Sequence, residues 1–225
     1  WPSWLYMRAY EAINIIYEAI NITRCKMNNV TEWLQTVGVW LSRIAYCRGF
    51  GIQSPSAYRF VRYVINEHYP YYAYADLQKR VPVESRVALR LLRLCLRVAN
   101  EVQPRYILDF IDGLSAERRE YFSAGARRAC ILPVAEGDEV PAVIDGERVV
   151  IRTDVQHVDA LLSLLPRIDS ASLVMVDGIH RDARSRETWQ RIVGNNHAAV
   201  CYDLYYTGIV MLDQSKHKRC YTINF

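Results

Sequence analysis

Long hydrophobic runs are absent from this chain of 225 residues. No stretch approaches the roughly 18 consecutive apolar residues that a membrane-spanning helix needs. A charged start followed by an apolar core and a small-residue cleavage site is also missing, so we do not expect a secretory signal. The sequence therefore predicts a cytoplasmic protein without a membrane span.

Cysteine pairs and basic runs are equally scarce. Six cysteines are present, but none forms a C-x-x-C pair, and their spacings suit neither a zinc site nor a small disulfide scaffold. We expect reduced, buried thiols, as is usual in cytosolic proteins. The net charge is +4, yet arginine and lysine are scattered along the chain. Because no basic patch stands out, we expect no nucleic-acid partner.

A short repeat marks the start of the chain, where YEAINI occurs at 10–15 and again at 17–22. Its polar members fall on one helical stripe: Glu11, Asn14, Glu18 and Asn21. A helix with so narrow a polar face needs to be covered. Four interpretations stay open: a helix that forms a homodimer, a membrane-surface helix, a leader packed on the domain, or residues upstream of a natural start at Met27. We treat residues 1–26 as an N-terminal helical leader.

Residues 27–100 are predicted to be a helical N-terminal region. The apolar spacing of residues 30–47 is typical of a helix, with Thr31 as its N-cap. A second helix is predicted over 55–66, because a serine N-cap is followed by a proline in the first helical position.

The most strongly patterned helix is predicted over residues 84–100. One of its faces carries arginines that we expect to be solvated: Arg86, Arg90, Arg93 and Arg97. The opposite face is apolar and is predicted to pack on a sheet: Ala88, Leu91, Leu92, Cys95 and Ala99.

After residue 100 the pattern alternates between strands and helices. Strands are predicted at 105–110, 128–134, 148–154 and 172–178, and helices at 115–126, 158–168 and 185–193. Three further strand segments, AAVCYDL, GIVMLD and RCYTINF, end the chain. The prediction for residues 101–225 is an α/β domain: a Rossmann-like, mostly parallel sheet with flanking helices and an antiparallel C-terminal hairpin.

Three segments support a family resemblance: RGFGIQSPSAYRFV, LVMVDGIHRD and CYDLYYTGIVMLDQSKHKRCYTINF. Their order and spacing over roughly residues 45–225 resemble a family of bacterial, mainly Bacteroidetes, class I S-adenosylmethionine-dependent methyltransferase-like proteins. LVMVDGIHRD resembles the strand-four motif of that family, Phe-x-Asp-Gly-Asn-His-Arg. Gln53 and Ser56 depart from the first motif, where the family has His and Phe.

The resemblance implies where S-adenosylmethionine would bind. Asp109, Asp112 and Gly113 correspond to the turn after the first strand, and Asp154 corresponds to the acidic residue near the end of the third strand, beside the adenine. The pattern is degraded, however. Ile111 and Ser115 stand where the family has glycines, and Pro133-Val134 stands where the second strand should end in an acid that takes the ribose hydroxyls. Glu136 could replace that acid only if its loop bends back.

Asp177 and His180 are the catalytic candidates that the same resemblance implies. The carboxylate would position or deprotonate a methyl acceptor, and the imidazole, whose pKa lies near neutrality, would be the second acid/base group. In related O-methyltransferases a fifth strand ends in paired metal ligands. Only residues 181–199 separate VDGIH from VCYDL, so this pair is missing and we expect no metal site.

Two functions follow from these observations. One is methyl transfer from S-adenosylmethionine to an unidentified, small-molecule acceptor. The other is a non-catalytic protein that keeps the methyltransferase fold as a binding module or partner subunit, because the cofactor motifs are altered at several positions at once. Titration with the cofactor separates the two.

Overall fold

The computed structural model describes residues 30–46, 49, 51–67, 69–111, 115–135, 138 and 140–225. The predicted leader, residues 1–26, lies outside these ranges. The chain divides into two compact units, one ending at Ser42 and the other spanning Arg43–Phe225. The described part of the first unit is a helix over residues 30–42, shorter than the predicted 30–47. No helix within the described ranges is long and apolar enough to cross a membrane.

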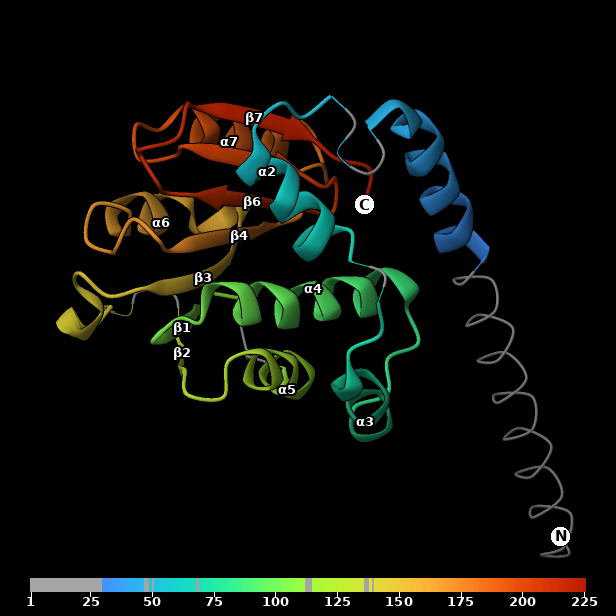
Figure 1. The fold of residues 1–225 in the computed structure, drawn as a ribbon, viewed down its shortest axis with the longest axis horizontal. Coiled ribbons are helices and arrows are strands. Elements are labelled where there is room, and N and C mark those ends of the chain that lie inside the picture. Colours follow the sequence, from blue (N-terminus) through green and yellow to red (C-terminus); the bar gives the residue numbers. More distant parts are fainter. Residues whose placement is uncertain are drawn as a thin grey trace, which may run out of the picture. The chain divides into compact units, whose positions relative to one another are not determined.

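A seven-stranded sheet forms the centre of the second unit (Figure 1). Its strands are β1 (Tyr106–Asp109), β2 (Cys130–Pro133), β3 (Val149–Asp154), β4 (Leu173–Asp177), β5 (Val200–Asp203), β6 (Thr207–Met211) and β7 (Arg219–Thr222). They lie in the order β2-β1-β3-β4-β6-β5-β7. Strand β6 runs antiparallel to both of its neighbours, and the other described pairs are parallel. This arrangement confirms the predicted fold class.

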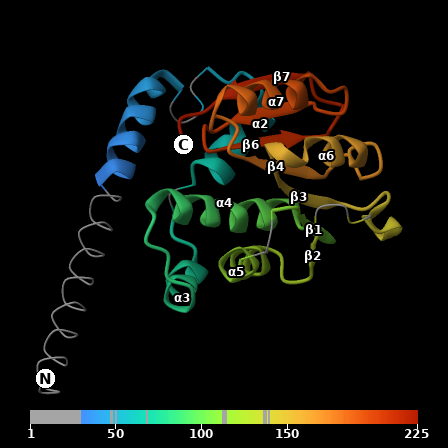
Figure 2. The ribbon, with the colours of Figure 1, turned by 180° about the vertical axis from the view of Figure 1, so that it is seen from behind.

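Helices cover both faces of the sheet (Figures 1 and 2). The elements of the second unit are η1 (Ile44–Tyr46), α2 (Pro55–Phe60), η2 (Val61–Ile65), α3 (Tyr72–Arg80), α4 (Arg86–Val102), α5 (Ala116–Gly125), η3 (Ala142–Ile144), η4 (Val155–His157), α6 (Val158–Leu164) and α7 (Ala183–Gly194). Residues 55–100, which the sequence groups with the N-terminal helices, therefore belong to the same compact unit as the sheet.

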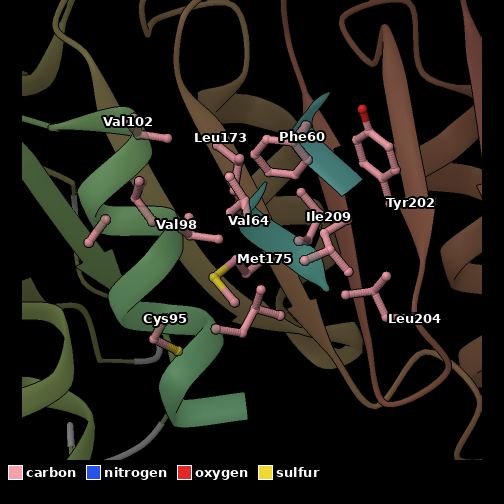
Figure 3. Packing of buried hydrophobic residues seen from close by; sticks show 14 of the residues in the cluster. Phe60, Val64, Cys95, Val98, Val102, Leu173, Met175, Tyr202, Leu204 and Ile209 are labelled. Atoms are coloured by element: carbon pink, nitrogen blue, oxygen red, sulfur yellow. The ribbon is translucent and has the colours of Figure 1, made fainter. Parts of the chain in front are cut away.

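Alternating strand residues separate the two layers of the core. On one face Ile107, Val150 and Met175 pack against α2, η2, α4 and α5. Their neighbours along the strands face the other way, where Ile151 and Val174 pack against α6 and α7. Figure 3 shows the first layer, with sticks from α4, the sheet and the segment that carries Phe60 and Val64 meeting in one cluster. Period-two burial is what a sheet covered on both faces requires.

The second predicted helix is capped as expected but changes its winding. Ser54 caps α2 by accepting a hydrogen bond from the backbone of Ala57, and Pro55 takes the first helical position. The segment that follows, η2, is a π-helix. Its wider turns bring Val64 and Ile65 into the core.

The arginine face of α4 is not uniformly solvated, which corrects the sequence interpretation. Arg97 is only 6% exposed. Its guanidinium donates hydrogen bonds to the backbone carbonyls of Val64 and Ile65, the latter at 3.0 Å, and to the hydroxyl of Tyr74 at 3.1 Å. The π-helical segment ends with carbonyls directed at this side chain, and they satisfy a charge that helical spacing alone placed in solvent.

The C-terminal strands differ in one respect from the predicted hairpin. Strands β5 and β6 form it, but β7 adds to the outer edge of β5 in a parallel orientation. Cys220 on β7 and Cys130 on β2 are therefore exposed, each on an edge strand of the sheet, whereas Cys95 and Cys201 are buried. All four are free thiols, and the expectation of burial is correct for two of them.

The strand order also changes how the motifs map onto the sheet. In a doubly wound sheet the order is 3-2-1-4-5-6, so the third strand lies beyond the second. Here β3 pairs with β1 on the side opposite β2, which is the place of a fourth strand. β4 then holds the place of a fifth strand. No described strand lies beyond β2.

Candidate functional site

The carboxyl ends of three neighbouring parallel strands bring three of the predicted site residues to one edge of the sheet. Asp109 ends β1, Asp154 ends β3 and Asp177 ends β4. Asp154 and Asp177 are directly opposed in the register of β3 and β4, and Asp109 is opposed to Arg152. This is the edge at which open α/β sheets bind ligands.

A cleft of about 550 Å³ opens at this edge. Its walls come from the start of α4 and the segment before it, the start of α5, and the ends of β3 and β4: Pro82, Val83, Glu84, Ala88, Leu91, Leu92, Ile111, Ser115, Glu117, Arg118, Arg152, Asp154, Asp177 and Arg181. The lining combines apolar residues, most of them on α4 and the segment before it, with charged residues of both signs. Among the described residues, none of β2 or the loop after it lines the cleft.

Arg152 and Asp177 form an ion pair on the floor of the cleft. The arginine side chain is only 8% exposed, and its Nε lies 3.0 Å from Oδ2 of Asp177, the same oxygen that Nη2 also reaches. Burial lowers the pKa of Arg152. The neighbouring Cys95, Asp177 and Asp109 raise this pKa by more than burial lowers it, so the net shift is upward and the guanidinium stays charged. Asp177 therefore has a permanent cationic partner.

Asp109 lies beneath the cleft rather than in it. Its side chain is fully buried, and Oδ1 accepts a hydrogen bond from the backbone N–H of Ile111 at 3.0 Å. The other oxygen, Oδ2, has no hydrogen-bond partner within the described chain, and the nearest cation, Nη1 of Arg118, is 4.0 Å away. Burial raises the pKa of Asp109, although Arg152, the Ile111 N–H and Arg118 oppose the shift.

Asp154 contacts His157 at the N-terminus of η4. Its Oδ1 lies 2.8 Å from Nδ1 of His157 and also accepts the backbone N–H of Gln156 at 2.9 Å. The sequence assigned Asp154 to the adenine side, but the observed strand order places it on the other side of β1 from β2. The role of Asp154 beside an adenine stays a prediction.

His180 is separated from the cleft. Its Nε2 lies 2.7 Å from Oδ2 of Asp203 and 3.2 Å from Nη2 of Arg43. Arg43 also bridges to Oδ1 of Asp203 at 2.9 Å, and the ring of Tyr205 stacks on the imidazole at a centroid distance of 5.1 Å. The two catalytic candidates thus have different partners: Asp177 pairs with Arg152, and His180 pairs with Asp203.

The residues of the expected glycine turn are only partly described. Asp112, Gly113 and Glu136 lie outside the described residues. Ser115 is the N-cap of α5, and its Oγ accepts hydrogen bonds from the backbone and Nε of Arg118. Ile111 lines the cleft. A capping serine explains why a glycine is not needed at the start of this helix.

Several charged residues of the cleft escaped the sequence analysis. Arg118, Arg152 and Arg181 looked like scattered surface arginines, because nothing in their local pattern shows that they converge. Arg181 packs against the backbone of Gly178, where an added Cβ would lie 2.8 Å from Nη2. For His157 a signal was available, since DVQH and DGIH repeat one Asp-x-x-His spacing at the ends of two strands.

The described residues contain no group of three or more His, Cys, Asp or Glu side chains that could hold a metal ion. Asp154 and Asp177 are adjacent carboxylates, but the guanidinium of Arg152 supplies the positive charge next to them. We make no metal assignment in this part of the chain.

Several described residues bear on how S-adenosylmethionine would fit here. The acidic residue of β1, Asp109, is sealed beneath the cleft, and the branched side chain of Ile111 occupies a wall that the resemblance leaves bare. At the end of β2, Val134 is buried, and Asp138 binds back to the amide of Ala135.

Comparisons with known proteins add the following findings. No family model matches the chain, and no curated protein matches it. Among solved structures, the cofactor-bound protein Rv0187 from MTB is 12% identical, with 63% of this chain and 88% of that chain covered and a TM-score of 0.42. The SAH-bound methyltransferase PaMTH1 of Podospora anserina is also 12% identical, with 72% of this chain and 97% of that chain covered and a TM-score of 0.44.

Proposed function

We propose that this chain is a non-catalytic protein of methyltransferase-like architecture that binds a small polar ligand in the cleft at the ends of β1, β3 and β4. One observation carries the proposal: charged side chains of both signs, Arg118, Asp154 and Arg181, line one cleft together with apolar residues of α4. Such a lining suits a small polar ligand.

The charges of the cleft favour a zwitterion, such as an α-amino acid. Within the described chain no ion pair involves the guanidinium of Arg181, and the nearest carboxylate oxygen to Arg118 is 4.0 Å away. These two arginines can receive a carboxylate. Asp154, on the same lining, can receive an ammonium group, while Leu91 and Leu92 offer an apolar wall for the side chain of the ligand.

Methyl transfer to a small-molecule acceptor is the second candidate. The observation that favours it is the pairing of Asp154 with His157 at the strand-four place, because a carboxylate backed by an imidazole can accept a proton from an acceptor hydroxyl. Asp177 is less suited to that role, since its Oδ2 already accepts two hydrogen bonds from Arg152.

We further propose a cytoplasmic location. A homodimer through the N-terminal helices stays a proposal, since residues 1–29 are outside the described ranges.

Calorimetric titration with S-adenosylmethionine distinguishes the two candidates. We expect no heat of binding at millimolar cofactor in the wild-type chain, because Ile111 lines the cleft and Asp109 is fully buried. A dissociation constant in the micromolar range would contradict the non-catalytic proposal. An Ile111→Gly variant that gained cofactor binding would locate the defect at the first turn.

Zwitterion binding needs its own measurement. A panel of α-amino acids at 10 mM is expected to raise the melting temperature of the wild-type chain, and Arg181→Met is expected to abolish the shift. Arg184→Met is the matched control, because this arginine is exposed on the first turn of α7 and does not line the cleft. Equal shifts for wild type and Arg181→Met, or no shift with any member of the panel, would rule out this ligand class.

A further inference from the structure

A second cavity lies on the side of α4 that faces away from the cleft. It has a volume of about 530 Å³ and is lined by the segment between η2 and α3, by α3, by α4 and by the last residue: Ile65, Asn66, Glu67, Tyr69, Pro70, Tyr71, Tyr74, Ala75, Gln78, Arg90, Arg93, Arg97 and Phe225. It shares no lining residue with the cleft. The two sites therefore use opposite faces of the same helix.

Positive charge dominates this cavity. Arg90, Arg93 and Arg97 follow one another at helical spacing, and Glu67 is the single acidic residue among the lining residues that the structure describes. Arg97 is fixed by carbonyl and hydroxyl acceptors and cannot turn away. Arg93 lies over the ring of Tyr74, with its Cζ 4.8 Å from the ring centroid, and Arg90 lies in the same way over Phe225 at 4.9 Å.

Two hydrogen-bond donors of the lining are buried without an acceptor. Nε of Arg93 and Nδ2 of Asn66 have no hydrogen-bond partner within the described chain. The Nη2 atom of Arg93 reaches only Oε1 of Gln78, at 3.4 Å. A buried donor without a partner costs about 1–3 kcal/mol, so native proteins rarely keep one unless something binds there.

We propose that this cavity binds the oxyanion group of a small molecule, a phosphate or a carboxylate. Arg93 and Asn66 would donate to its oxygens, and Arg90 and Arg97 would supply the surrounding positive potential. Tyr71 and Phe225 line the same space and offer apolar surface for the rest of the ligand. This cavity is separate from the cleft, so anion binding here does not depend on the proposed function.

The test is titration of the intact chain with inorganic phosphate and, separately, with benzoate, at constant ionic strength set by chloride. At least one of the two is expected to bind with a dissociation constant below 10 mM, which is about −2.7 kcal/mol. Arg93→Met and Asn66→Leu are each expected to weaken that binding at least tenfold. Arg86→Met is the matched control, because Arg86 begins the same helix, is exposed and does not line the cavity.

Three results would overturn the proposal: no binding of either anion below 10 mM, equal affinity in wild type and Arg93→Met, or an equal loss in Arg86→Met. Circular dichroism of each variant checks that it is folded. If Arg93→Met does not fold, Asn66→Leu decides, since it removes a neutral side chain and leaves every charge in place. Preference for phosphate or for benzoate identifies the oxyanion.

Discussion

Replacing Gly125 by alanine is expected to lower the free energy of unfolding by about 3 kcal/mol. Gly125 is the last residue of α5, and its backbone lies against Leu96 and Ala99 of α4. A Cβ on this residue would lie 2.2 Å from the backbone oxygen of Leu96 and 2.9 Å from the Cβ of Ala99. The clash is with backbone, so no side-chain rotation relieves it and the two helices must move apart.

Moving α4 and α5 apart would also disturb other contacts between the two helices. The side chain of Gln103 donates to the carbonyl of Gly125 at 3.1 Å, and Leu96 and Tyr121 pack together in the cluster under α3. For a chain of this length, 3 kcal/mol corresponds to a fall in melting temperature of roughly 6–12 °C. Thermal and urea unfolding measure the loss.

Gly194→Ala is the matched control for this prediction. Gly194 is also the last residue of its helix, α7, but nothing lies within 4 Å of the position of an added Cβ. Alanine there is expected to leave stability unchanged or to raise it by a few tenths of a kcal/mol, since alanine is the better helix former. Equal stability of the two variants would mean that the contact between α5 and α4 tolerates the extra carbon.

The sequence predicts the helices and strands well, but it does not predict which strands lie next to each other in the sheet. Period-two and helical spacing are local properties, so β1, β3 and β4 and helices α4 to α7 appear within a few residues of their predicted ends. The position of a strand in the sheet depends instead on connections and long-range packing. Local patterns give no sign that β3 pairs with β1 on the side opposite β2.

The candidate site shows the same division. The acidic strand ends were predictable, because a carboxylate after an apolar strand marks the ligand-binding edge. Their partners were not. Asp177 meets Arg152 and His180 meets Asp203, each pair joining residues at least 23 positions apart on different elements. Arg97 belongs to the same class of error, because its burial depends on carbonyls from a segment more than 30 residues earlier.

Replacing Arg152 by methionine is expected to destabilise the chain by about 3 kcal/mol at pH 8. The change removes a buried cation that forms an ion pair with Asp177 and also lowers the pKa of Asp109 through its charge. Asp177 faces the cleft and can be hydrated, but Asp109 is fully buried and its Oδ2 has no hydrogen-bond partner within the described chain. Without the guanidinium, the ionised form of Asp109 has lost its largest electrostatic support.

The loss should depend on pH in a fixed direction. Burial already raises the pKa of Asp109 above its value in the unfolded chain, and loss of Arg152 raises it further. A raised native pKa means that the folded form holds a proton that the unfolded form releases, so stability is lost as the pH rises through the native pKa. Arg152→Met is therefore expected to cost less at pH 5 than at pH 8.

Urea unfolding of wild type and variant at the two pH values measures this difference. Arg191→Met, which breaks an exposed ion pair with Asp159, is the control and is expected to cost less than about 1 kcal/mol at either pH. A loss for Arg152→Met that is equally large at pH 5 and pH 8 would show that packing, and not the charge of Asp109, sets the cost. In that case Arg152 would stabilise the fold through the packing of its side chain, and not through its charge.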